Sequence, residues 1–301
     1  MNSTRPNLNR RGMVPHSARQ GRLSVGVMVA LALAAGGAQA QDALNAVRVA
    51  GYGPLGDPAA AFWEQAPPTE VPTLPQTVVL PNHAPQAIGA LQVRAVHNGQ
   101  WLAFLLEWKD PTLSDRILVS EFGDQVAVEL PIGYTAGGQT PLPSPMMGNP
   151  GGRVSLMQWR AALQHDVDYG EPQIRDLYPF ALVDVYPDQV LRATDARPYM
   201  GALGLDNPVS RPRPSPVLDQ MAEGWGSTTV KPEQHTDGRG VWKDGVWRVA
   251  ITHPLATESE NDARLMPGVE TSVAFAVWDG GNKEAGSRKG WAMWVPLRIA
   301  N

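Results

Sequence analysis

The alternation of apolar and polar positions predicts short β-strands along most of the chain. Residues 90–95 alternate in this way, and residues 101–108 (Trp-Leu-Ala-Phe-Leu-Leu-Glu-Trp) form a short, nearly continuous apolar run. A run of this length suits a buried strand better than a helix. Asn98-Gly99 lies between the two segments and predicts a tight hairpin turn that joins them.

Further strands follow towards the C-terminus. Residues 125–132 alternate again, with Val126, Val128 and Leu130 on one face. The same reasoning predicts strands at 245–252, 271–278 and 289–299, turns at 243–245 and 279–282, and a helical period only at 215–222. The sequence therefore predicts an all-β fold, an antiparallel β-sandwich with few short helices.

Two segments do not fit this strand pattern. Residues 161–231 are rich in Pro, Asp, Tyr and Arg without clear periodicity, which predicts a long irregular insertion of the kind that carries function or an interface. Residues 41–76 include a proline-rich stretch from 67 to 75 and are predicted to form an extended N-terminal segment. The β-sandwich domain is then expected to span 77–301.

The N-terminus is typical of an export signal. Residues 1–40 hold five arginines and no acidic residue, then an apolar run from 23 to 35, and end in Ala38-Gln39-Ala40. This pattern predicts a signal peptide cleaved near Ala40 and a periplasmic protein. The run is shorter than the roughly 20 residues that a membrane span needs, so we expect no membrane anchor in the mature chain. Arg10-Arg11 lies far ahead of the run and leaves the export route open.

Charge and cysteine content narrow the function classes. The net charge of the chain is −4, and loss of the five signal arginines lowers it to −9. Such a surface repels nucleic acid and favours a basic partner. The chain has no cysteine, which excludes thiolate-ligated iron–sulfur clusters, a catalytic cysteine and covalently attached haem c. Ten tryptophans against five phenylalanines indicate flat rings around a cavity or an interface, beside their commoner use in the core.

Histidine, the commonest haem ligand, forms no pair with metal-ligand spacing in this sequence. His16 would be removed with the predicted signal peptide. The other five are predicted to be surface or loop residues: His83, His97, His165, His235 and His253. His165 is the histidine to test first by substitution. Hydrolytic chemistry is not indicated either, because the sequence has no nucleophile elbow and no phosphate-binding glycine loop.

Seven stretches carry a family resemblance through their order and spacing. They are 105–112, 124–131, 145–148 leading to 158–159, 207–210, 222–226, 240–247, and 275–280 with Arg288, Lys289 and Trp294 behind it. Together they resemble the haem-binding γ subunits of type II enzymes in the dimethyl sulfoxide reductase family of molybdoenzymes. That group includes ethylbenzene dehydrogenase, dimethyl sulfide dehydrogenase, chlorate reductase and selenate reductase. The resemblance covers about residues 91–297.

This resemblance implies a β-sandwich that holds one non-covalent haem b, with one methionine and one lysine as axial ligands of the iron. Carried over residue by residue, it selects Met147 and Lys289, with Met146 and Lys283 as alternates. From the residues alone, Met157 is as good a sulfur donor. The sequence departs from the family pattern at two positions that touch neither ligand: Gly290 stands where a serine is common, and His253-Pro254 where an arginine-proline is common.

The two ligand types have distinct chemical requirements. A methionine thioether is a soft, neutral donor that raises the reduction potential, whereas lysine binds a metal only as its neutral amine. On a strand that begins at Lys289, the residues Trp291, Met293 and Val295 share its face and are expected to desolvate the amine. Met147 lies in a Pro/Gly-rich loop that is expected to present its sulfur without strain.

The resemblance further implies a non-catalytic electron-transfer subunit. Its partners would be an iron–sulfur β subunit, a molybdenum-containing α subunit and a soluble cytochrome c or similar carrier. Two other hypotheses stay open at this point. One is a haem-free exported β-sandwich that binds carbohydrate or another small ligand on stacked tryptophans, and the other is a purely structural subunit.

Overall fold

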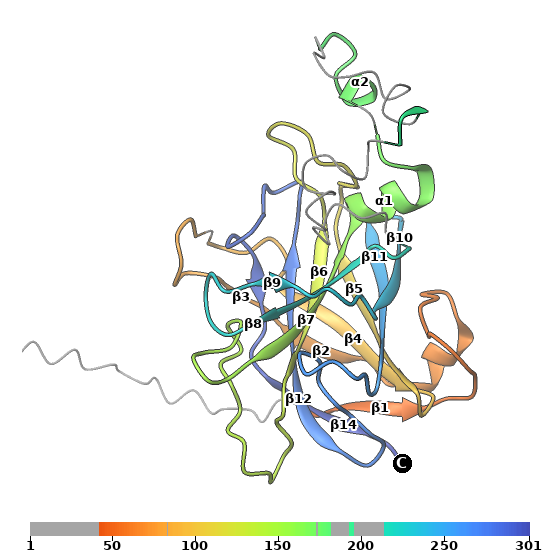
Figure 1. Ribbon diagram of the computed structural model, residues 1–301, viewed down its shortest axis with the longest axis vertical. Coiled ribbons are helices and arrows are strands. Elements are labelled where there is room, and N and C mark those ends of the chain that lie inside the picture. The colour runs from red at the N-terminus through yellow and green to blue at the C-terminus, as the bar shows by residue number, and fades with distance from the viewer. Residues whose placement is uncertain (1–41, 83, 173, 182–192, 196–213) are drawn as a thin grey trace, which may run out of the picture. The chain divides into compact units, whose positions relative to one another are not determined.

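A computed structural model describes residues 42–82, 84–172, 174–181, 193–195 and 214–301. The described residues all belong to one compact unit (Figure 1). Its first elements are β1 (Leu44–Arg48), the 3₁₀ helix η1 (Ala61–Gln65), β2 (Thr69–Pro72), β3 (Leu74–Pro75), β4 (Ala90–His97), β5 (Trp101–Lys109), β6 (Gln125–Pro131) and β7 (Val154–Arg160). They are followed by α1 (Ala161–Tyr169), α2 (Ile174–Leu177), β8 (Val217–Ala222), β9 (Thr229–Val230), β10 (Asp237–Lys243), β11 (Val246–Pro254), β12 (Glu270–Trp278), β13 (Gly290–Trp291) and β14 (Val295–Ile299).

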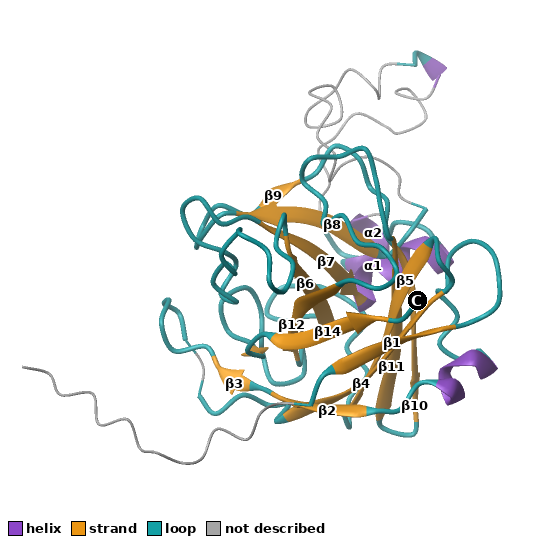
Figure 2. Cartoon of the chain, turned by 90° about the horizontal axis from the view of Figure 1, so that it is seen from below, coloured by secondary structure: helices purple, strands orange, loops and turns teal. Residues whose placement is uncertain are grey.

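One continuous path of strands makes two layers. The order is β10-β11-β5-β4-β1-β14-β12-β6-β7-β8-β9. Strand β12 joins the layers, because its first residues (270–273) pair with β14 and its last residues (274–278) pair with β6. We call β10-β11-β5-β4-β1-β14 the first layer and β12-β6-β7-β8-β9 the second layer (Figure 2).

The core lies between these two layers. The largest cluster of buried side chains takes every second residue from strands of both layers. Phe104 of β5 meets Phe275 of β12 edge to face at 6.0 Å, and Trp159 of β7 meets Trp247 of β11 at 5.0 Å. Burial of such large rings is among the strongest contributions to stability. The predicted all-β sandwich is therefore confirmed.

The strand pattern located β4, β5, β6, β11 and β12 correctly. Strands β4 and β5 pair antiparallel, and the predicted turn joins them. Asn98 Oδ1 accepts the N–H groups of Gln100 and Trp101, while Gly99 takes a positive φ of 88°. Glycine is the residue that adopts this conformation without a steric cost. The hairpin is thus encoded locally.

Three details of the prediction are wrong. Strand β1 pairs parallel to both β4 and β14, so the sheet is mixed. Residues 215–222, predicted as helical, contain strand β8, because pairing with β7 overrides a weak local preference. The predicted strand 289–299 is broken into β13 and β14, which pair with different parts of β12.

The two irregular segments also contribute regular structure. The predicted N-terminal segment 41–76 provides β1, η1, β2 and β3, and Trp63 of η1 packs in a second apolar cluster with residues of β4, β5 and β11. The predicted insertion 161–231 contains α1, α2, β8 and β9, and the remainder of it lies partly outside the described residues.

Residues 1–40, predicted to be a signal peptide, lie outside the described residues. Within the described part, no helix has both the length and the apolar character to cross a bilayer.

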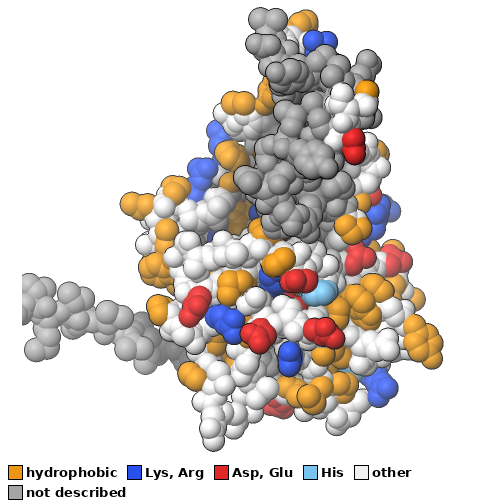
Figure 3. All heavy atoms as spheres, viewed as in Figure 1, with side chains coloured by type: hydrophobic (Ala, Val, Ile, Leu, Met, Phe, Trp, Pro, Cys, Tyr) orange, Lys and Arg blue, Asp and Glu red, His pale blue; other side chains and the backbone are white. Residues whose placement is uncertain are grey.

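Acidic and basic side chains lie interspersed on the described part of the face in Figure 3. The acidic excess expected from the sequence is therefore not gathered into one patch on that face.

Candidate functional site

A cavity of about 470 Å³ lies on the outer face of the second layer. Its floor is made by residues of β6, β7 and β12 that point away from the core, such as Ala127, Gln158 and Ala276. Their neighbours in sequence, such as Val126 and Val277, point into the core instead. The volume lies in the range of pockets that bind cofactors and other small molecules.

Met147 reaches the cavity from the loop between β6 and β7. Its φ is 66°, which is rare for a non-glycine residue, so the expectation of an unstrained loop is wrong at this position. Gly148 also has a positive φ, and a Cβ there would collide with the carbonyl oxygen of Gly152. The amide of Gly224 donates to the Met147 carbonyl at 2.7 Å. Backbone contacts from the β8–β9 connection thus help to fix the loop that carries the sulfur.

Lys289 enters the same cavity from the end of the turn that joins β12 to β13. Its Nζ lies 4.0 Å from Met147 Sδ and 5.1 Å from the centre of the Trp278 ring. Burial lowers the pKa of Lys289, and the nearby charge of Glu129 opposes that shift. The two residues selected by the resemblance, Met147 and Lys289, therefore face each other across a short gap in one cavity.

Glu129 is a residue of this site that the sequence reasoning missed. It is 7% exposed, lies on β6 and points into the cavity. Its Oε1 accepts no hydrogen bond from the described residues. Burial raises the pKa of Glu129 to about 8, against the opposing effects of the Lys289 charge and a hydrogen bond from the Met147 backbone. Val126, Val128 and Leu130 alternate along β6 and point into the core. The same alternation places Glu129 on the opposite face of the strand.

The alternate ligands fall in different places. Met146 also lines the cavity. Lys283 is exposed in the turn after β12 and does not line the cavity. Met157 is fully buried on the core face of β7, where it packs between the layers. Of the candidate ligands, Met146, Met147 and Lys289 therefore line the cavity, whereas Lys283 and Met157 do not.

The predicted apolar face around Lys289 is only partly correct. Trp291 lines the cavity, but Met293 is half exposed and Val295 lies in the core between the layers. The cause is the break between β13 and β14, which interrupts the alternation. Trp278 of β12, which was not predicted, covers the amine instead.

None of the described histidines lines the cavity. His165 lies on α1 with Nε2 at 2.9 Å from an Arg116 nitrogen. His97 and His253 are buried in β4 and β11, so the prediction of a surface or loop position is wrong for both. The backbone N–H of His235 donates to Asp219. His16 and His83 lie outside the described residues.

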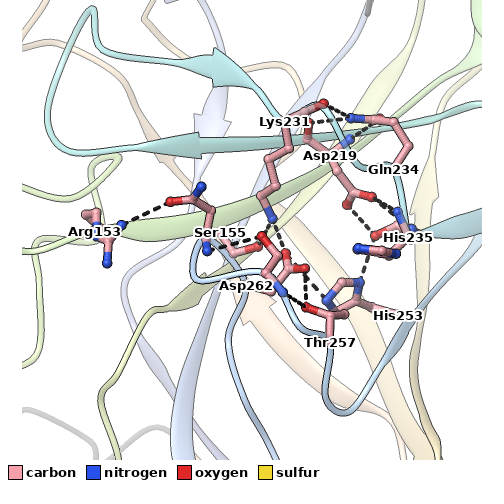
Figure 4. A network of polar contacts seen from close by, with 12 residues as sticks. Arg153, Ser155, Asp219, Lys231, Gln234, His235, His253, Thr257 and Asp262 are labelled. Carbon is pink, nitrogen blue, oxygen red and sulfur yellow. Dashed lines mark hydrogen bonds and ion pairs between the residues drawn. The ribbon is translucent and has the colours of Figure 1, made fainter.

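Another lysine, Lys231, is fully buried in a polar network (Figure 4). Lys231 Nζ donates to Ser155 Oγ at 2.7 Å and forms an ion pair with Asp262. Thr257 Oγ1 donates to the other oxygen of Asp262 at 2.7 Å. Burial alone would raise the pKa of Asp262, but the hydrogen bonds from Lys231 and Thr257 hold it below its usual value. This network ties β7 to two connecting loops.

Three carboxylates also converge outside the cavity. Asp110, Asp124 and Asp279 each offer an oxygen within 4.8 Å of the other two. Burial, and then the charge of Asp110, raise the pKa of Asp124 to about 7. Asp124 accepts hydrogen bonds from the Gly280 backbone N–H and the Trp247 indole N–H. The cluster therefore connects the loops after β5 and β12 to the start of β6.

The comparisons with known proteins bear on this arrangement. A family model described as ethylbenzene dehydrogenase matches residues 60–194 and 214–290, which is more than half of the chain. The chain belongs to the ethylbenzene dehydrogenase family. The matched ranges include Glu129, Met147 and Lys289, and the resemblance stated from the motifs is confirmed at the level of the family.

Two curated relatives agree with membership of this ethylbenzene dehydrogenase family. The chain is 28% identical over 270 residues to the chlorate reductase subunit gamma of Ideonella dechloratans, covering 87% of this chain and 86% of that protein. It is 24% identical over 238 residues to a candidate respiratory nitrate reductase heme subunit, ORF7, of Haloferax mediterranei, covering 79% of this chain and 66% of that protein. Among solved structures, a family 9 carbohydrate-binding module from Caldicellulosiruptor kristjanssonii in complex with glucose is matched with a TM-score of 0.38 and 8% identity, covering 86% of this chain and 96% of that chain.

Proposed function

We propose that this family member is a haem b electron-transfer subunit, and that Met147 Sδ and Lys289 Nζ are the two ligands that would hold the haem iron. The observation that carries the proposal is the 4.0 Å separation of these two atoms inside one cavity. The two residues are 142 positions apart in sequence. The names of the relatives, one a gamma subunit of a reductase and one a heme subunit, support the same function.

The donor set fits a metal held between two ligands. Met147 Sδ is a soft, neutral donor, and Lys289 Nζ becomes a donor once the amine has lost its proton. The two atoms stand 4.0 Å apart in the same cavity, so both residues could hold one metal ion there. A haem bound here would supply a one-electron redox couple, and a thioether ligand would raise its potential. Met146 is the alternate sulfur donor, because it lines the same cavity.

The protein prepares the lysine for this role by burial. Lysine binds a metal only after it has lost its proton. Burial already lowers the pKa of Lys289. Glu129 opposes this when it is ionised, but burial raises the pKa of Glu129 to about 8, so the carboxyl retains its proton at neutral pH. At neutral pH, Glu129 therefore adds little negative charge that would stabilise the ammonium form of Lys289.

The proposal includes a compartment and partners. We place the mature chain in the periplasm after cleavage near Ala40, on the basis of the basic leader and the apolar run that follows it. There it would pass electrons between the iron–sulfur subunit of a molybdenum oxidoreductase and a soluble cytochrome c. The substrate would be converted on the molybdenum subunit, so this chain would have no turnover of its own.

Absorption spectroscopy of the purified chain tests the proposal. We expect a Soret band, a reduced α-band and a pyridine haemochrome characteristic of haem b in the wild type. Met147→Ala and Lys289→Ala are each expected to lose the haem or to give a high-spin spectrum, because one axial donor is removed. Met146→Ala separates the two sulfur donors and is expected to keep the low-spin spectrum.

Matched controls separate loss of a ligand from general damage. Met293→Ala and Lys283→Ala remove a methionine and a lysine from exposed positions. His165→Ala removes the histidine that the sequence selects for the first test as a ligand. All three are expected to keep the wild-type spectrum. A protein that stays colourless when haem is supplied, or a normal low-spin spectrum in both ligand variants, would contradict the proposal. A colourless wild type that binds sugar instead would favour the haem-free binding module.

A further inference from the structure

The floor of the cavity has a distinct polar part. At its centre, Ala127 of β6 pairs with Ala276 of β12, so only methyl groups rise from the sheet there. Two residues earlier on β6, Gln125 pairs on the other side of the strand with Arg160 of β7. Both of these side chains line the cavity. A flat apolar body can therefore rest on the alanines while its edge faces polar groups.

Hydrogen bonds within the floor hold Arg160 in place. A terminal guanidinium nitrogen of Arg160 donates to Gln158 Oε1 at 2.8 Å. Gln158 Nε2 donates in turn to Gln125 Oε1 at 2.7 Å, and Gln220 Nε2 donates to Gln158 Oε1 at 2.9 Å. The side chain of Arg160 is partly buried. The guanidinium is thus held by neighbouring side chains before any ligand binds.

The cavity places its two basic groups at different points. Of the described residues that line it, Lys289 and Arg160 are the basic ones. Lys289 Nζ lies beside Met147 and over the Trp278 ring. Ala127 pairs with Gln158, so Arg160 lies diagonally across from Ala127, at about 7–8 Å between Cα atoms. A second cationic group therefore stands to one side of the apolar centre.

We propose that Arg160 binds the carboxylate groups at the edge of the ligand, and that the cavity selects a flat tetrapyrrole that carries free propionates. This inference rests on the proposed haem function and names the group that recognises the acidic edge. A guanidinium pairs with a carboxylate through two parallel hydrogen bonds, which gives both affinity and orientation. Arg160 is a positioning residue, because it acts on the orientation of the ligand and not on the iron.

Reconstitution of the haem-free mature chain with two probes tests the inference. Haemin carries free propionates, and haemin dimethyl ester has the same ring and iron without the negative charges. We expect wild type to bind haemin about 10–100-fold more tightly than the ester, the range expected for hydrogen bonds to a charged group. Arg160→Gln is expected to abolish this preference while the low-spin spectrum is kept, because both axial ligands remain. Arg160→Lys is expected to restore part of the preference.

Arg298→Gln is the matched control, because Arg298 lies exposed on β14 in an ion pair with Glu270. It should bind both probes as wild type does. Equal affinity of wild type for the two probes overturns the inference about Arg160 and leaves the haem proposal standing, and so does an unchanged preference in Arg160→Gln. A wild type that binds neither probe overturns the haem proposal itself. If Arg160→Gln does not fold, the affinities of the wild type for haemin and for its dimethyl ester still test the inference, because that measurement uses no variant.

Discussion

Two lysines of this protein, the fully buried Lys231 and the partly buried Lys289, have opposite surroundings. Lys231 donates to the carboxylate of Asp262 and to a hydroxyl, in a network that satisfies its charge (Figure 4). Lys289 faces a thioether sulfur, an indole ring and a carboxyl whose pKa is raised to about 8. Residue type is therefore a poor guide to function, because the partner decides whether the amine remains an ammonium ion or becomes available to a metal.

The acids at the two sites, Asp262 and Glu129, have pKa values shifted in opposite directions. The pKa of Asp262 is held below its usual value, so its contribution to stability is present above about pH 4 and is lost as pH falls through the folded pKa. The pKa of Glu129 is raised, so its contribution is present below about pH 4.5 and is lost as pH rises towards 8. One site is built for an ion pair, and the other site disfavours charge. That difference suits structure in the first case and ligand binding in the second.

Removal of each lysine is expected to give the largest contrast. Lys231→Met leaves the Asp262 carboxylate buried without its cation, and we expect it to lower the free energy of unfolding by about 3–5 kcal/mol. Lys289→Met in the haem-free chain removes a poorly compensated charge and is expected to be neutral or stabilising. Urea denaturation of both variants at pH 7 measures the difference. Equal destabilisation by the two substitutions would show that the lysines are not distinct in this way.

The pH dependence of stability is expected to give the next largest effect. In the haem-free chain, unfolding becomes easier as pH rises from about 4.5 to about 8, because the folded state holds the Glu129 proton more tightly than the unfolded state. Glu129→Gln removes this part of the slope, on the order of a few kcal/mol over that window. Urea midpoints measured at several pH values report it. A slope that is the same in wild type and Glu129→Gln would contradict the raised pKa.

An exposed ion pair supplies the baseline against which both sites are judged. Arg298 and Glu270 form a pair at 2.9 Å on the surface, with both side chains more than half exposed. Arg298→Gln is expected to change the free energy of unfolding by less than about 1 kcal/mol, because water screens both charges. Thermal melts of this variant beside Lys231→Met make the comparison. An effect as large as that of Lys231→Met would mean that burial does not decide the outcome.

Local patterns determined a large part of the fold. Strands β4, β5, β6, β11 and β12 follow from alternation or short apolar runs, and the turn at Asn98-Gly99 follows from its dipeptide. Strand β8 and the helix α1 were missed, because pairing partners and tertiary packing outweigh weak local preferences. Alternation on β6 also implied that Glu129 faces away from the core. What lies on that outer face cannot be read from one strand.

The sequence by itself determined which residue types are available at the site: no cysteine, and a methionine and a lysine within recognisable motifs. Only the tertiary structure decided that Met147, Lys289, Glu129 and Arg160 line one cavity. The physical reason is that β12 passes from one layer to the other, and its pairing with β6 and β13 brings the Met147 loop and the turn before Lys289 to the same outer face. Strand periodicity is a property of neighbouring residues, whereas strand order depends on how the two layers pack around their common core.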